Sequence, residues 1–303
     1  MIRILLQTTI PAADDDWSIH RYSLLRDYLT SLKDERGEPL FAVTARDREP
    51  DSRGHDSVLS SLADSDFNEI WLFAADTGNG LSAQDCAGIS AFRRRGGGVL
   101  ATRDHQDAGA SICSLGGVGA AHYFHTRNQD PDVLRRRVDD TETTPISWPN
   151  YHSGRNGDYQ RIIPVEPVHE LLRLPDSSAQ LIEFFPAHPH EGGVGTPEGE
   201  PNARVIAVGT SKITNRPFNL IVAFEDGEDK EGNRVGRALA HSSFHHFADY
   251  NWNTDAGCPT FVSESPGDGF KQNPRALADI RAYVRNAATW LAGQRVDRPH
   301  QDK

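Results

Sequence analysis

The chain has 303 residues, 37% of them hydrophobic, and a formal net charge of −11 at pH 7. No apolar run approaches the roughly 20 residues of a membrane-spanning helix, so no membrane partner is expected. The acidic balance offers no dominant basic face, which argues against nucleic acid as a partner. The three cysteines, Cys86, Cys113 and Cys258, are too few and too far apart for a disulfide framework or a zinc-ligand pair. A cytoplasmic location is therefore expected.

The beginning of the chain alternates between short apolar runs and helical patterns. Strands are predicted at 3–8 and 40–43, with a helix over 18–33 between them and a short helix over 58–63 after them. Strands that alternate with helices in this way are typical of parallel sheets.

The stretch 69–109 organises the rest of the chain. Its apolar run 70–74 has the character of a strand that is buried on both faces. Ser82 stands at a helix N-cap, with Asp85 three residues later, and a glycine triplet can end that helix in a left-handed cap. The run 99–102 predicts the next strand, which completes a right-handed β-α-β unit.

The second half of the chain has a looser pattern. The segment 128–203 is rich in proline, glycine, aspartate and histidine, and predicts a loop-rich insertion over the carboxyl edge of the sheet. Strands return at 204–208, 220–224 and 237–240, and 274–291 predicts a closing amphipathic helix.

The order of elements predicts one α/β domain over 1–303. We expect a flavodoxin-like, doubly wound and mainly parallel sheet with helices on both faces and long loops over the carboxyl edge. A helix over 108–115 is expected after the second strand of the organising stretch.

Several short motifs resemble one known family. The run 236–247 reads Gly-Arg-Ala-Leu-Ala-His-Ser-Ser-Phe-His-His-Phe, and Asn273-Pro274 and Trp290 follow it. Together with the helix 81–98 and its glycine triplet, these features resemble the ThuA-like (trehalose utilisation) proteins of the class I glutamine-amidotransferase-like fold. The resemblance implies a fold more than it implies a function.

The chain departs from glutamine amidotransferases at the turn where those enzymes carry their nucleophilic cysteine. That turn reads Thr102-Arg103-Asp104-His105, and Cys113 comes about two helical turns later. Glutamine hydrolysis by a cysteine nucleophile is therefore not expected.

Histidines and a carboxylate follow two strands that should end at the same edge of the sheet. Asp104 and His105 follow one strand, and His241, His245 and His246 follow the other. Imidazole is a natural acid or base near neutral pH, so we assign catalysis to Asp104, His105 and His246. The alternative is that these histidines only hold loops together in a non-catalytic binding or assembly domain.

The histidine spacing also suggests a metal. His241 and His245 stand four apart, which is the spacing of two ligands on one helical face. With His105 they form a candidate site for zinc or a similar divalent ion. An enzyme that uses His105 as a metal-free base would carry the same residues.

Other residues near this edge are candidates for binding the substrate, although ordinary loop packing also explains them. They are Asp16, Trp17, Asp76, His188, His190, Tyr250 and Trp252. The leading prediction is a ThuA-like enzyme, hydrolase-like or carbohydrate-processing, that acts on a small polar molecule by acid–base or metal-assisted chemistry. A carbohydrate derivative is one candidate substrate. The sequence leaves open whether the chain forms a homo-oligomer.

Overall fold

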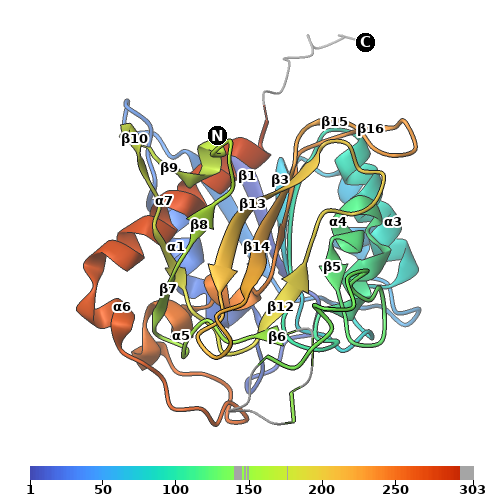
Figure 1. The fold of residues 1–303 in the computed structure, drawn as a ribbon. Helices are drawn as coiled ribbons and strands as arrows, with labels where there is room; N and C mark the ends of the chain where they lie inside the picture. The colour runs from blue at the N-terminus through green and yellow to red at the C-terminus, as the bar shows by residue number, and fades with distance from the viewer. Residues whose placement is uncertain (140–144, 147, 149, 176, 294–303) are drawn as a thin grey trace, which may run out of the picture.

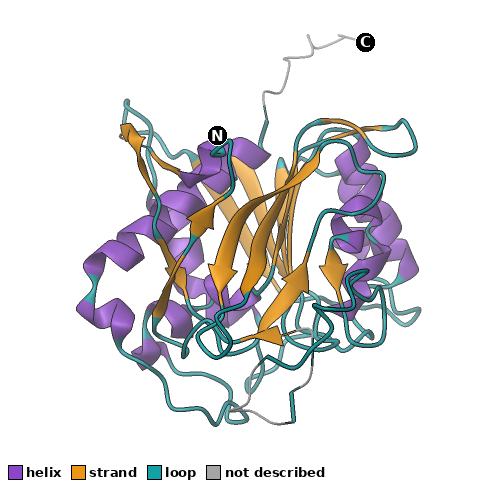
Figure 2. Cartoon of the chain, viewed as in Figure 1, coloured by secondary structure: helices purple, strands orange, loops and turns teal. Residues whose placement is uncertain are grey.

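A computed structural model describes residues 1–139, 145–146, 148, 150–175 and 177–293. Its centre is a large sheet (Figures 1 and 2) whose described strands lie in the order β2 (Phe41–Arg46), β1 (Ile2–Thr8), β3 (Glu69–Phe73), β4 (Gly98–Thr102), β17 (Ala238–His241), β14 (Pro217–Phe224), β13 (Ala203–Thr210) and β8 (Ile163–Pro164). The first five of these strands are parallel, and the last three pair antiparallel.

Helices cover both faces of this sheet. One face carries α1 (Ser23–Ser31) and α7 (Pro274–Leu291). The other carries α2 (Ser57–Ser60), α3 (Ala83–Arg94) and α4 (Gly116–Ala120). The predicted doubly wound, mainly parallel α/β architecture is confirmed.

The remaining helices are short. They are α5 (Asp249–Trp252), α6 (Gly269–Gln272) and 3-10 helices at Ile19–Tyr22, Leu62–Asp64, Ala110–Ser114, Glu170–Leu172, Phe244–His246 and Thr254–Ala256.

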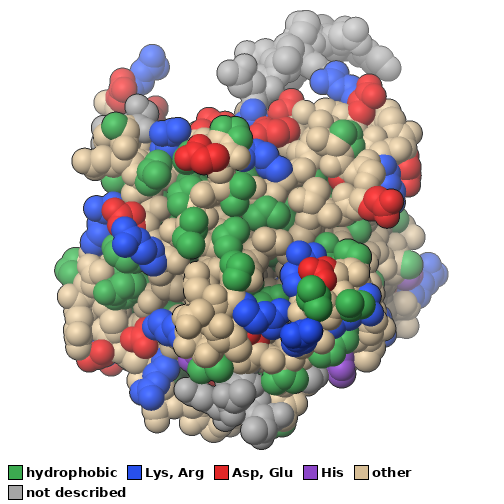
Figure 3. All heavy atoms as spheres, in the orientation of Figure 1, with side chains coloured by type: hydrophobic (Ala, Val, Ile, Leu, Met, Phe, Trp, Pro, Cys, Tyr) green, Lys and Arg blue, Asp and Glu red, His purple; other side chains and the backbone are tan. Residues whose placement is uncertain are grey.

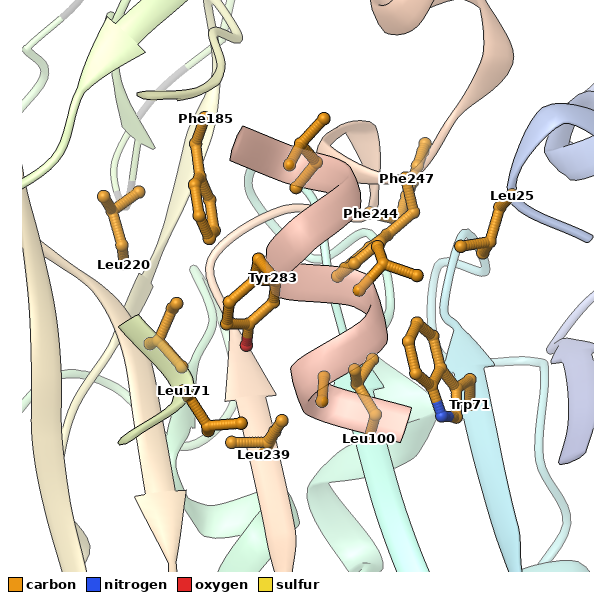
Figure 4. Close-up of a cluster of buried hydrophobic side chains, with 14 of the residues drawn as sticks. Leu25, Trp71, Leu100, Leu171, Phe185, Leu220, Leu239, Phe244, Phe247 and Tyr283 are labelled. Atoms are coloured by element: carbon orange, nitrogen blue, oxygen red, sulfur yellow. The ribbon is translucent and has the colours of Figure 1, made fainter. Parts of the chain in front are cut away.

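Side chains that alternate along the central strands build the two halves of the core. In β3, Trp71 and Phe73 pack on the α7 side, and Ile70 and Leu72 pack on the α3 side. Figure 4 shows Trp71 on one side of α7 and Tyr283, which belongs to α7, on the other side with Phe185. All five residues of β3 are buried. Each large apolar side chain buried in this way contributes about 1.5–3 kcal/mol, which explains the uninterrupted apolar run in the sequence.

Helix α3 begins and ends as the sequence predicts. The Ser82 hydroxyl accepts a hydrogen bond from the Asp85 N–H, and the Asp85 carboxylate accepts one from the Ser82 N–H. This reciprocal pair forms a capping box. Gly96 adopts a left-handed backbone with φ of 95° just after the helix, where a residue with a Cβ atom would be strained.

Three predicted helices differ in the structure, and one of them, predicted over 58–63, is divided into α2 and the 3-10 helix Leu62–Asp64. The segment predicted as a helix over 108–115 is the 3-10 helix Ala110–Ser114, because Gly109 before it and Gly116 after it have positive φ. The helix predicted over 18–33 is divided into the 3-10 helix Ile19–Tyr22 and α1.

The predicted insertion 128–203 forms several short strands beside the main sheet. They are β6 (Asn150–Tyr151), β7 (Tyr159–Arg161), β9 (Arg173–Leu174), β10 (Ser177–Leu181), β11 (Phe184–Pro186) and β12 (Glu191–Val194). Strand β12 pairs with β6 and with β5 (His122–Tyr123), which precedes the insertion. Residues 140–144, 147, 149 and 176 of the insertion lie outside the described residues.

On the face in Figure 3, hydrophobic side chains show between charged ones over β13 and β14. A last hairpin joins β15 (Gly227–Glu228) to β16 (Arg234–Val235).

His122 makes folding sensitive to acid. Its ring is fully buried beside the carbonyls of Val118 and Ala101, and burial, followed by the charge of Arg103, lowers its pKa from 6.5 to about 4. The unfolded chain binds more protons between these two values, so the free energy of unfolding falls as pH drops from about 6.5 to about 4. The loss due to this group is on the order of 3 kcal/mol.

A His122→Gln variant tests this expectation. Its free energy of unfolding, measured by urea denaturation across that pH window, should fall less steeply than that of the wild type. Replacement of the exposed His20 with glutamine is the control and should keep the wild-type slope. An unchanged slope in the His122 variant would show that another group carries the acid sensitivity.

Candidate functional site

The loops after β4 and β17 meet at the carboxyl edge of the sheet. The two strands are parallel neighbours, and Thr102 pairs with His241 at their ends. The Phe244 N–H donates to the Arg103 carbonyl at 2.8 Å, which ties the two loops together. Asp104, two residues beyond β4, is 5% exposed. Ligands of open α/β sheets bind at this edge.

Three histidines surround the Asp104 carboxylate. His188 Nε2 lies 2.9 Å from Oδ1, His105 Nδ1 lies 3.0 Å from Oδ2, and His245 Nε2 lies 3.8 Å from Oδ2. The His105 contact is at ion-pair distance but is not aligned as a hydrogen bond. The rings of His188 and His245 stack with centroids 3.7 Å apart and planes 11° apart. The two predicted strand ends therefore converge through His245 and Asp104.

The cluster reaches the surface through His105. The side chain of His105 is 29% exposed, whereas those of His188 and His245 are 3% exposed. Its ring lies 5.4 Å from that of His190, and His190 Nε2 lies 3.1 Å from Glu264 Oε1. The hydrogen bond with His190 lowers the pKa of Glu264. A molecule that arrives from solvent would meet His105 before the buried pair.

Burial controls the charge of the inner histidine. Burial disfavours the charged form of His188 and acts to lower its pKa, and the stacked ring of His245 acts in the same direction. The carboxylate of Asp104 acts in the opposite direction because it favours the protonated ring. The charge of His188 therefore depends on its contact with Asp104.

Distances alone make Asp104, His188 and His245 a candidate metal group, since their ligand atoms all lie within 4.8 Å of one another. An imidazole binds an ion in the plane of its ring, and two rings stacked with nearly parallel planes cannot both point at one ion. The group therefore fits an ion only if the two rings move apart. The set predicted from sequence, His105, His241 and His245, is not brought together.

His241 packs against α7. It is fully buried, its Nε2 lies 2.7 Å from the Tyr283 hydroxyl of α7, and its ring packs on Phe247. The four-residue spacing to His245 does not place both on one helical face. His241 ends β17, whereas His245 belongs to the 3-10 helix Phe244–His246.

His246 contacts a second buried carboxylate instead of Asp104. Glu191, at the start of β12, is fully buried, and its Oε1 lies 3.1 Å from His246 Nε2. Glu191 also accepts hydrogen bonds from Ser153 Oγ at 3.0 Å, Gln160 Nε2 at 2.6 Å and Ser242 Oγ at 2.7 Å. This network joins β12, the loop after β17 and two parts of the insertion.

Of the aromatic candidates, Trp17 contacts the cluster. The ring of Trp17 meets that of His245 edge-on with centroids 4.6 Å apart, and Trp17 is 5% exposed. Trp252 is buried and donates from Nε1 to the carbonyl of His246 at 2.9 Å. Tyr250 is also buried, and burial raises its pKa. None of the three offers the open ring face that stacking on a sugar would need.

Two predicted carboxylates hold loops. Asp76 is buried and accepts hydrogen bonds from the Ser111 N–H, the Ser111 hydroxyl and the Gly78 N–H. Asp16 accepts one from the N–H of Trp17 at 2.7 Å. His188 and His190, in contrast, both lie in the cluster or beside it.

Sequence reasoning missed four residues of this region. Glu191 and Glu264 hold histidines, and Asn156 and Asn251 contact the stacked pair through their amide groups. Glu191 directly follows His190 in the sequence, and this position next to two candidate histidines was the signal that could have identified it. The asparagines lie in loops without any distinguishing pattern.

Comparisons with known proteins identify the fold. No family profile and no curated protein matches the chain. A solved ThuA-like protein from Parabacteroides merdae matches with a TM-score of 0.52 and 14% identity, over 98% of this chain and 92% of that chain. The chain therefore has the ThuA-like fold. At this identity the likeness establishes the fold alone.

Two further structures are similar to a lesser degree. A ThuA-like protein from Bacteroides uniformis matches with a TM-score of 0.45 and 9% identity, covering 96% of this chain and 91% of that one. The glutaminase domain of a CTPS from Trypanosoma brucei matches with a TM-score of 0.41 and 12% identity, covering 95% and 94%. Within the described residues, no helix is both long enough and apolar enough to cross a bilayer.

Proposed function

We propose that this protein is an enzyme that acts on a small polar molecule, with a carbohydrate derivative as the first candidate, by acid–base chemistry at Asp104. The supporting observation is the set of three imidazoles around one carboxylate at the carboxyl end of a central parallel strand. Imidazoles beside a carboxylate transfer protons readily near neutral pH.

The proposed roles follow from exposure and contact. His105 is the group that reaches solvent, so it would exchange a proton with the substrate. Asp104 would orient the His105 ring from 3.0 Å and connect it to the buried His188 and His245. A metal-assisted reaction would use the same carboxylate and would first require the two stacked rings to separate.

A cysteine nucleophile has no place in this proposal. Cys86 is buried in α3, and burial raises its pKa to about 12, so its thiolate is scarce at neutral pH. Cys113 belongs to the 3-10 helix Ala110–Ser114 and not to the turn after β4. The residues on that turn are Arg103 and Asp104.

Turnover of a panel of sugars, sugar lactones, keto sugars and glycosides, followed by proton NMR, tests the proposal. We expect conversion of at least one compound by the wild type, and a loss of about 10²–10⁴-fold in Asp104→Ala. Treatment with iodoacetamide should leave the rate unchanged. The control variant is His169→Gln, because His169 is as buried as His188 but contacts Glu225 instead.

The second candidate is a non-catalytic binding domain, and the hydrogen bonds of Asn156 and Asn251 favour it because they tie three loops together. Binding of a compound without conversion, with equal affinity in the wild type and in Asp104→Ala, would support this candidate. Loss of activity on alkylation would contradict the acid–base proposal and would support a mechanism with a cysteine nucleophile.

A further inference from the structure

The hydrogen bonds of Asn251 determine the tautomer of His245. Asn251 Nδ2 lies 3.0 Å from the carbonyl oxygen of Ala187, which can only accept, so this end of the amide must be the donor. The other end, Asn251 Oδ1, lies 3.0 Å from His245 Nδ1 and can only accept. The proton of a neutral His245 is therefore on Nδ1.

The same chain of contacts determines the tautomer of His188. Asn251 Nδ2 also donates to Asn156 Oδ1 at 2.9 Å, so the end of Asn156 that faces it is the oxygen. That oxygen lies 3.1 Å from His188 Nδ1. His188 Nδ1 must therefore carry a proton as well. All four side chains are buried, so these contacts with one another replace contacts with bulk water.

These tautomers leave three proton acceptors at one place. A neutral imidazole protonated on Nδ1 has a lone pair on Nε2, and an ionised carboxylate only accepts. His188 Nε2 nevertheless lies 2.9 Å from Asp104 Oδ1, a hydrogen-bond distance that two lone pairs cannot share without a proton between them. The remaining acceptor, His245 Nε2, lies 3.8 Å from Asp104 Oδ2.

We infer that Asn156 and Asn251 are positioning residues that fix both histidine tautomers, and that Asp104 and His188 consequently hold one shared proton between Oδ1 and Nε2. The catalytic meaning of this inference rests on the proposed function, but the proton itself can be measured without turnover. When the proton leaves, Asp104 is an ionised carboxylate and His188 is neutral. When it returns, the same hydrogen bond forms again.

The shared proton would supply the reaction with an acid that water does not reach. Asp104 contacts His188 through Oδ1 and His105 through Oδ2, so the carboxylate joins the buried proton to the exposed ring. After giving a proton to a substrate, His105 could recover one at Nδ1 from Asp104 Oδ2 once its ring turns into line with that oxygen, and Asp104 Oδ1 would in turn recover the proton from His188 Nε2. The asparagines act only through the histidines and do not touch the reacting atoms.

Nitrogen-15 and proton NMR of histidine-labelled protein test the inference. In the wild type we expect His245 with a proton on Nδ1 alone and His188 with protons on both nitrogens, the Nε2 proton being shifted downfield and slow to exchange. In Asn156→Ala, His188 Nδ1 loses its acceptor, so His188 should carry its proton on Nε2 only and donate it to Asp104. The cluster then binds one proton fewer.

Matched variants separate the tautomer effect from general damage to the fold. Asn156→Asp keeps an acceptor oxygen and should show the wild-type pattern. Asn286→Ala removes an amide that bonds the carbonyls of Leu171 and Arg173, far from the cluster in sequence, and should change neither histidine. If Asn156→Ala does not fold, the wild-type spectrum alone decides.

An unprotonated Nδ1 on His188 or His245 in the wild type would overturn the inference, as would an unchanged His188 in folded Asn156→Ala. Addition of zinc, manganese or cobalt provides a further check. A metal that displaces the downfield proton and raises the melting temperature would show a metal centre in place of a shared proton. A failed substrate panel would affect the proposed function without changing these spectra.

Discussion

Replacing His105 with glutamine is expected to lower kcat by about 10²–10⁴-fold on a substrate that the wild type converts. His105 is the exposed member of the cluster, and its Nδ1 lies 3.0 Å from Asp104 Oδ2. Glutamine has a similar reach but cannot donate or accept a proton at neutral pH. KM should change much less than kcat, because the substitution removes proton transfer and leaves the walls of the site in place.

The stability of this variant should remain close to that of the wild type, since the side chain is 29% exposed. Steady-state kinetics and a melting curve on the same preparation measure both effects. His20→Gln, which replaces an exposed histidine in the 3-10 helix Ile19–Tyr22, is the matched control. A kcat within a few-fold of the wild type would remove His105 from the proton path.

Replacing Glu191 with alanine is expected to lower the free energy of unfolding by about 3–5 kcal/mol. Its carboxylate accepts hydrogen bonds from Ser153, Gln160 and Ser242, and it contacts His246. Alanine leaves these polar groups buried without their acceptor, and an unsatisfied buried group costs about 1–3 kcal/mol. Denaturation by guanidinium chloride measures the loss.

The isosteric variant Glu191→Gln provides the comparison. Its amide keeps one oxygen acceptor, and the Ser242 hydroxyl can accept from the new NH₂ group, so we expect a smaller loss than with alanine. If Glu191→Ala lost less than about 1 kcal/mol, the network would be reorganising around water and would not be a fixed support of the site.

Most of the fold could be predicted because its signals are local. The apolar run of β3, the capping box of Ser82 and Asp85 and the left-handed Gly96 each depend on residues that are close in the sequence. The closing helix α7 has the bounds predicted for it, with Asn273 accepting a hydrogen bond at its start and proline in its first turn. Local backbone preference and burial of apolar surface determine such elements.

The positions of the polar residues could be predicted where they depended on the sheet. Asp104 and His105 could be placed because residues that follow parallel strands collect at one edge. The same rule brought His245 to Asp104. It could not tell which side chains turn toward each other after the strand ends, so His241 and His246 were grouped with the cluster although they contact Tyr283 and Glu191.

The sequence by itself therefore determined the α/β architecture, the absence of a cysteine on the turn after β4, and the edge at which polar residues collect. Only the tertiary structure decided that His188, from the insertion, completes the cluster and that Asn156 and Asn251 orient its rings. His188 lies 84 positions from Asp104 in the sequence, and Asn156 lies 95 positions from Asn251. No local pattern encodes such contacts, because they form only when separate loops pack over the same edge of the sheet.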